Sequence, residues 1–164
     1  MERLWAPWRM AYIKGEDSEE GCFFCRKLAE DDKDADNYVL HRSELAFVIM
    51  NVFPYSNGHL MISPRRHTGD FLDLSEEEAA ELMRLTRRCI QVLGETLQPH
   101  GFNVGLNLGE AAGAGISDHL HVHLVPRWKG DTNFMPVLAD VKVIPDHLTH
   151  TYQLLKGSFA KGGN

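Results

Sequence analysis

Three histidines alternate with three aliphatic residues in the segment His119-Leu120-His121-Val122-His123-Leu124. Because successive side chains of a β-strand point to opposite faces, this period of two places every imidazole on one face and every aliphatic side chain on the other. The segment is rich in β-forming residues and is followed by Pro126, so we predict a strand over 119–125. Its aliphatic face belongs on a core, and its imidazole face then needs a polar or chemical role.

Three interpretations of the imidazole face are open. It is a solvated strand face that happens to be rich in histidine, although the strict phase argues against chance. It is a metal chelate, since His-x-His on a strand offers two ligands to one zinc. Or it supports phosphoryl or nucleotidyl transfer, with one neutral imidazole as nucleophile and its neighbours as donors to phosphate oxygens. The spacing alone does not separate the last two.

Length and composition predict a single globular domain. The chain has 164 residues, of which 43% are hydrophobic and 24% charged, enough for one well-buried core and short for two. No apolar run approaches the length of a membrane span, and no secretory signal pattern begins the sequence. We therefore expect a cytoplasmic protein.

The formal net charge of −6 would slow the encounter of this chain with an anionic ligand. Basic stripes interleaved with aromatic residues, which are expected of a nucleic-acid binder, are missing. A phosphate ligand would have to be bound by local donors, namely backbone N–H groups, imidazoles and nearby cations. Four cations flank the segments of interest and are candidates for this role: Arg65, Arg66, Arg127 and Lys129.

The remaining pattern predicts an α+β domain on an antiparallel sheet. Ser75 and Glu78 form a capping box that begins a long amphipathic helix, which Pro99 and Gly101 end. A short helix is expected around 24–29. Strands are expected at 38–41, 45–50, 59–62, 102–108 and 119–125.

The pair Cys22-Phe23-Phe24-Cys25 has the gap of a zinc knuckle, of a redox dithiol or of coincidence. The surroundings are not those of a redox motif, which favours zinc. Two more ligands must then come from far along the chain, because no His-x-x-x-His follows nearby. Cys89, in the middle of the long helix, is expected to be a small buried hydrophobic residue.

The triad and the segments before it resemble the histidine triad (HIT) family of nucleotide hydrolases and transferases. Asn51-Val-Phe-Pro-Tyr-Ser-Asn-Gly-His59 and the strand after it look like a second motif of that family, and the loop 107–117 looks like its phosphate loop. The resemblance implies a meander of about five antiparallel strands with one long helix packed on it, paired into a two-fold dimer. It also implies one HIT domain over 1–164, with an N-terminal arm at 1–20, a core at 20–150 and a flexible tail at 157–164.

The same resemblance assigns roles to individual residues. His121 would be the catalytic nucleophile that carries the nucleotidyl group. A structural zinc would be held by Cys22, Cys25, His67 and His119. The substrate would be bound by Asn51, His59, Asn107, Gly113, Gly115, Ser117 and His123, with His59 and His123 donating to phosphate oxygens, Asn107 contacting phosphate or leaving-group oxygens and Asn51 meeting the ribose.

The start of the chain and the segment after the triad look most like the bacterial branch that contains the diadenosine tetraphosphate phosphorylases. The resemblance therefore implies an enzyme that cleaves a dinucleoside polyphosphate at the α-phosphate, with water or phosphate as acceptor. The sequence leaves that acceptor open. It also leaves open a nucleoside phosphoramidate hydrolase of the same fold and a non-catalytic nucleotide-binding module.

Overall fold

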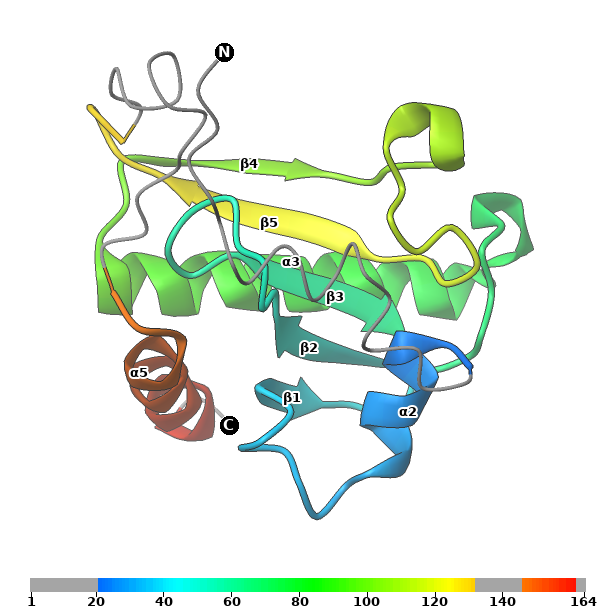
Figure 1. Ribbon diagram of the computed structural model, residues 1–164, viewed down its shortest axis with the longest axis horizontal. Helices are drawn as coiled ribbons and strands as arrows, with labels where there is room; N and C mark the ends of the chain where they lie inside the picture. Colours follow the sequence, from blue (N-terminus) through cyan, green and yellow to red (C-terminus); the bar gives the residue numbers. More distant parts are fainter. Residues whose placement is uncertain (1–20, 132–145, 162–164) are drawn as a thin grey trace, which may run out of the picture.

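A five-stranded antiparallel sheet forms the centre of the molecule (Figure 1). The computed structural model describes residues 21–131 and 146–161. Within them the strand order is β1-β2-β3-β5-β4. The strands are β1 (Val39–Arg42), β2 (Ala46–Met50), β3 (Leu60–Pro64), β4 (Gly101–Gly105) and β5 (Val122–Arg127). The predicted fold class is confirmed, but β5 lies between β3 and β4, so the order departs from a strict meander in its last two strands.

The long helix α3 (Glu76–Leu97) begins and ends as the sequence predicts. The Ser75 hydroxyl accepts the backbone N–H of Glu78, and the Glu78 carboxylate accepts the backbone N–H of Ser75. This capping box satisfies two N–H groups that the first turn would leave without partners. The helix ends at Gln98, whose left-handed φ of 48° turns the chain toward β4.

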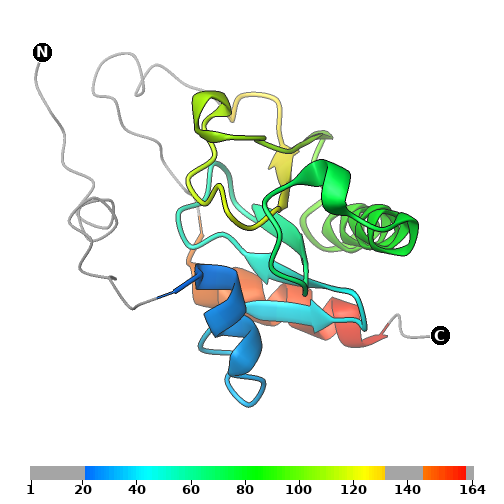
Figure 2. The same cartoon turned by 90° about the vertical axis from the view of Figure 1, so that its right-hand side faces the viewer.

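The two faces of the sheet are covered differently (Figure 2). Even-numbered residues of β2 and β3, such as Val48 and Ile62, pack with α3 and with α5 (Leu148–Lys161) in the larger core. Odd-numbered residues, such as Phe47 and Met61, pack with α2 (Phe23–Ala29) on the opposite face. Because both faces are covered, all five residues of β2 are buried. The triad imidazoles lie on the α2 face.

Helix α5 is absent from the sequence prediction. Its buried side chains Tyr152, Leu155 and Phe159 recur at helical spacing and complete the larger core beside α3. The expected flexible tail at 157–164 is therefore wrong for 157–161, because Phe159 is buried there. Residues 162–164 and the predicted arm at 1–20 lie outside the described residues. Two short 3-10 helices, η1 (Phe71–Asp73) and η2 (Glu110–Ala112), lie in the connections around α3 and β4.

No helix in the described ranges 21–131 and 146–161 has the length and apolar character needed to cross a membrane. Cys89 is fully buried in α3, as predicted, and burial raises the pKa of its thiol. This cysteine therefore packs as a small hydrophobic residue.

Candidate active site and Cys/His cluster

His121 lies in the lead-in to β5 and is almost completely buried. Its Nδ1 is 2.9 Å from the backbone carbonyl oxygen of His119. Since a carbonyl can only accept, Nδ1 carries the proton and Nε2 carries the lone pair. Burial lowers the pKa of His121 below its ordinary value, so the ring is neutral near pH 7. His121 therefore presents a nucleophilic nitrogen of fixed identity.

His123 carries its proton on the other ring nitrogen, Nε2, because of the hydrogen bonds that His59 makes. The backbone N–H of Tyr55 donates to Nδ1 of His59 at 3.0 Å, so a neutral His59 carries its proton on Nε2. That Nε2 is 3.0 Å from Nδ1 of His123 and donates to it. His123 is then left with its own proton on Nε2. A chain of two hydrogen bonds thus makes His123 a donor.

Burial, and after it the nearby His121, lowers the pKa of His123 to about 4. The donor is therefore a neutral imidazole at physiological pH. The rings of His121 and His123 meet edge to face with centroids 4.7 Å apart. The ring with a lone pair on Nε2 and the ring with an N–H group on Nε2 are therefore direct neighbours.

Asn51 and Tyr55 support this arrangement from the loop before β3. The side-chain oxygen of Asn51 accepts a hydrogen bond from the backbone N–H of Phe53 at 2.9 Å. The Nδ2 atom of Asn51 lies 3.4 Å from Nδ1 of His59. The Tyr55 ring lies 4.6 Å from His59 and 5.8 Å from His123 between centroids. Sequence reasoning gave Tyr55 no role, and its place in the Asn51–His59 motif was the available signal.

The remaining predicted substrate residues lie in the loop between β4 and β5. The Asn107 amide donates to the carbonyl of Gly113 at 3.3 Å, and Gly113 has a left-handed φ of 87°, which favours glycine. Gly113, Gly115 and Ser117 are exposed. These contacts shape the loop itself, and its contact with a substrate stays a prediction.

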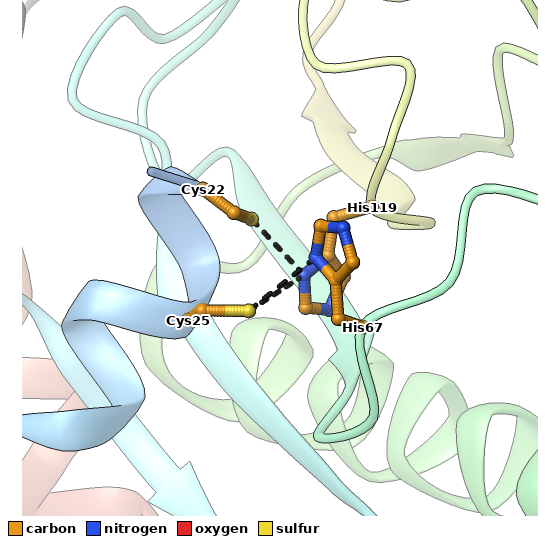
Figure 3. Close-up of side chains that lie close together, drawn as sticks. All are labelled: Cys22, Cys25, His67 and His119. Atoms are coloured by element: carbon orange, nitrogen blue, oxygen red, sulfur yellow. Dashed lines mark hydrogen bonds between the residues drawn. The ribbon is translucent and has the colours of Figure 1, made fainter. Parts of the chain in front are cut away.

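Four side chains from three separate segments of the chain, among them the first histidine of the triad, lie close together (Figure 3). Cys22 Sγ lies 3.2 Å from His119 Nδ1, and Cys25 Sγ lies 3.4 Å from His67 Nδ1 and 3.6 Å from His119 Nδ1. All four candidate ligand atoms lie within 4.8 Å of one another. Tetrahedral zinc with ordinary bond lengths requires sulfur–nitrogen separations of about 3.5 Å. The residues present therefore fit a four-coordinate metal.

Both imidazoles of this Cys/His cluster are oriented for metal binding. His119 donates from Nε2 to the carbonyl oxygen of Pro64 at 2.9 Å, which leaves the Nδ1 lone pair facing the sulfurs. His67 Nε2 lies 3.8 Å from the Asp118 carboxylate. Backbone carbonyls and carboxylates are the usual outer partners of metal-binding histidines. Burial, followed by the Cys22 thiol, raises the pKa of Cys25 to about 11. Without a cation this thiol is therefore protonated, and a bound metal ion would supply the charge that stabilises the thiolate.

Two of the four cations proposed as phosphate donors are occupied locally. Arg66 binds the Glu78 and Asp73 carboxylates at 2.8 and 2.6 Å. Arg127 binds the Asp131 carboxylate at 2.6 Å. The charges of Arg66 and Arg127 are thus balanced by neighbouring carboxylates, which the sequence analysis did not predict. Arg66 and Arg127 are therefore poor candidates for binding a phosphate at the triad.

The antiparallel sheet and the histidines at a spacing of two are those of a histidine triad protein. The family model of the HIT domain matches residues 32–130, and the chain belongs to that family. A relative named AP-4-A phosphorylase, from Mycobacterium tuberculosis (strain ATCC 25618 / H37Rv), is 40% identical over 98% of this chain and 86% of its own length.

Two further proteins widen the comparison. The asymmetrical bis(5′-nucleosyl)-tetraphosphatase of Schizosaccharomyces pombe is 31% identical over 57% of this chain and 50% of its own length. The crystal structure of a Zn-bound histidine triad family protein from Mycobacterium smegmatis superposes with a TM-score of 0.70 at 27% identity, covering 86% of this chain and 94% of that one. The resemblance inferred from the sequence is thereby confirmed at the level of family and fold.

Proposed function

We propose that this protein cleaves a dinucleoside polyphosphate, such as diadenosine tetraphosphate, at an α-phosphate through a covalent nucleotidyl intermediate on His121. The observation that carries the proposal is the pairing of an Nε2 lone pair on His121 with an N–H donor on His123, with ring centroids 4.7 Å apart. The names of the mycobacterial and fission yeast relatives support this class of substrate.

In the first step, Nε2 of His121 attacks the α-phosphorus. A phosphorus–nitrogen bond forms, and the bond from phosphorus to the bridging oxygen breaks, so that the oxygen leaves with the electron pair as part of a nucleoside polyphosphate. The His121 ring then carries a positive charge. Its Nδ1–H continues to donate to the His119 carbonyl, which stabilises that charge.

His123 and His59 act as one unit in this step. The Nε2–H of His123 donates to a non-bridging oxygen of the transferring phosphoryl group, whose negative charge is spread over those oxygens. The Nε2–H of His59 donates a hydrogen bond to Nδ1 of His123 at 3.0 Å and so keeps the proton of His123 on its Nε2. We therefore assign His59 a positioning role through His123, in place of the direct phosphate contact expected from the sequence.

In the second step, an oxygen of water or inorganic phosphate attacks the same phosphorus. The phosphorus–nitrogen bond breaks and the electron pair returns to Nε2 of His121, which restores the neutral ring. With diadenosine tetraphosphate, phosphate as acceptor yields ADP and ATP, whereas water yields AMP and ATP. We propose that Asn107, Gly113, Gly115 and Ser117 contact the phosphates or the leaving group, and that Asn51 contacts the ribose.

We assign the Cys/His cluster to zinc, bound by Cys22, Cys25, His67 and His119. Four protein ligands close the coordination sphere, so this metal joins α2 to the strand end and stabilises the fold. The Zn-bound relative from Mycobacterium smegmatis supports the assignment. Elemental analysis of protein purified without chelators should find one zinc per chain, and its absence would contradict the assignment.

We further propose that the protein is a two-fold dimer. In the described part of the chain, β4 pairs with β5 on one side and is the last strand of the sheet on the other, and Val104 at that edge is 49% exposed. An unpaired strand edge is a template for a second chain. Light scattering coupled to size exclusion tests the proposal, and a monomer at micromolar concentration would refute it.

A cytoplasmic location is part of the proposal. The three cysteines are free thiols in the structure, and zinc binding through thiolates suits a reducing compartment. Cell fractionation with an antibody against the protein tests this, and recovery outside the cytosolic fraction would count against it.

The enzymatic proposal is tested by trapping the intermediate. Protein is mixed with diadenosine tetraphosphate, with and without inorganic phosphate, quenched in base and measured as intact mass. We expect a nucleotidyl adduct in the wild type and none in His121→Ala. The control is His150→Ala, which removes an exposed histidine paired with Asp146. Turnover by His121→Ala equal to the wild type, with no adduct in either, would refute the proposal.

A further inference from the structure

The two phenylalanines between Cys22 and Cys25 have no part in metal binding or in the proposed chemistry. Phe23 is half-buried, whereas Phe24 is 0% exposed. The Phe24 ring lies 5.1 Å from the ring of His119 and 5.0 Å from the ring of His121, between centroids. One side chain of α2 thus touches both a candidate metal ligand and the candidate nucleophile.

The His121 ring is held from several directions. Its Nδ1–H donates to the carbonyl of His119, and its ring meets His123 edge to face. Among the described residues, its other ring contact is with Phe24, at a tilt of 41°. A single hydrogen bond leaves an imidazole free to swing about that bond, whereas a packed ring restricts it. Phe24 therefore restrains the direction in which Nε2 points.

Phe24 is itself placed by the cysteines. It lies within one turn of α2, between two residues that contact His119 and His67. Any movement of Cys22 and Cys25 away from those imidazoles carries Phe24 with it, because Phe24 and Cys25 lie in the first turn of α2 and Cys22 is its N-cap residue.

We propose that Phe24 is a positioning residue for His121, and that it couples the orientation of the nucleophile to occupation of the Cys/His cluster. The expected effect on rate rests on the proposed function, whereas the contact between Phe24 and His121 does not depend on it. A reacting atom misplaced by about 1 Å loses on the order of 100-fold in rate.

The test compares Phe24→Leu with Phe47→Leu. Phe47 is a matched control because it is also 0% exposed, belongs to the same core cluster and packs on Phe24 with centroids 6.0 Å apart. We expect kcat for diadenosine tetraphosphate to fall about 10- to 100-fold in Phe24→Leu, with KM changed less than about 3-fold. In Phe47→Leu we expect kcat within about 3-fold of the wild type. Phe24→Met, which refills part of the space, should recover part of the loss.

A measurement without substrate separates positioning from general damage. Long-range ¹H–¹⁵N spectra of the imidazoles report which ring nitrogen of His121 carries the proton and whether the ring is in one state. We expect the single Nδ1–H form in the wild type and in Phe47→Leu, and an averaged signal in Phe24→Leu. Removing bound metal from the wild type with a chelator should change the His121 signal in the same direction.

Equal losses of kcat in the two leucine variants, or a His121 signal unchanged in Phe24→Leu, would overturn the inference. Failure of the proposed function has a different signature. His121→Ala would then turn over like the wild type, while the imidazole spectra would still report whether Phe24 restrains His121.

Discussion

Gly69 lies where the loop that carries His67 meets the loop before the triad, and replacing it with alanine tests how closely those loops pack. An added Cβ would lie 2.5 Å from the carbonyl oxygen of Ser117 and 3.0 Å from Cα of Asp118. These neighbours are backbone atoms, so no side-chain rotation can relieve the contact. The φ angle of Gly69 lies outside the left-handed region, so the clash alone sets the cost.

The magnitude follows from the distances. Carbon–oxygen contacts below about 3 Å must open, which requires a shift of about 0.5–1 Å between two backbone segments, and such overpacking costs about 1–3 kcal/mol. Replacing glycine with alanine reduces the entropy of the unfolded chain and returns about 0.4–1 kcal/mol. We therefore expect Gly69→Ala to lose about 1–2 kcal/mol of unfolding free energy. The same shift separates His67 from His119, so metal affinity should fall as well.

Urea unfolding measures the change, with Gly94→Ala as the matched control. Gly94 is exposed in α3, and an added Cβ there meets nothing within 4 Å. Alanine is favoured over glycine in a helix by about 1 kcal/mol, so this variant should be more stable than the wild type. The same chemical change is thus expected to have opposite signs at the two positions. A Gly69→Ala protein as stable as the wild type, with unchanged zinc affinity, would refute the packing argument.

Three further changes have expected outcomes. Cys25→Ser should remove zinc and lower the thermal midpoint sharply, since structural zinc contributes on the order of 10 kcal/mol of binding free energy. The control Cys89→Ser should retain the metal, and calorimetry with elemental analysis measures both variants. A Cys25→Ser protein of unchanged thermal midpoint would contradict a structural role for the metal. Burial lowers the pKa of His123 from 6.5 to about 4, so between these pH values the unfolded chain binds a proton that the folded chain does not, and the free energy of unfolding falls as the pH drops from 6.5 toward 4. Urea midpoints measured across this pH range should fall less steeply in His123→Gln than in the wild type. Parallel profiles would show that His123 does not contribute. Arg66→Gln should lower the unfolding midpoint by removing the cation from Glu78, and the difference should shrink at high salt if the contact is electrostatic.

Local patterns predicted the elements around the site well. The capping box at Ser75 specifies the start of α3, and the alternation around His121 specifies which side chains share a face, because both depend on residues close in sequence. Helix α5 escaped prediction although Tyr152, Leu155 and Phe159 have helical spacing. Their periodic run is short, and its helical state depends on the core that α3 and the sheet provide.

The division of labour among the three histidines needed information from outside the strand. The period of two groups them on one face, yet His119 faces Cys22 and His123 faces His59, which lie on segments far away in the sequence. The metal-ligand set came from family resemblance, and the structure brings those four side chains together. Phe24 carried no such signal, since a phenylalanine between two cysteines looks like any other core residue.

The polarity of the site explains how a chain of net charge −6 can receive a polyphosphate. The triad itself offers no imidazolium group at neutral pH, because burial lowers the pKa of His123 to about 4 and that of His121 below its ordinary value. The fold instead fixes where each neutral proton sits, using the N–H of Tyr55 behind His59 and the carbonyl of His119 behind His121. A donor fixed in this way needs no charge and does not reorganise when negative charge develops on the phosphate. Both rings must be neutral for the proposed chemistry. Protonating His121 would remove the lone pair of the nucleophile. Protonating His123 on Nδ1 would break its hydrogen bond with His59, which fixes the donor.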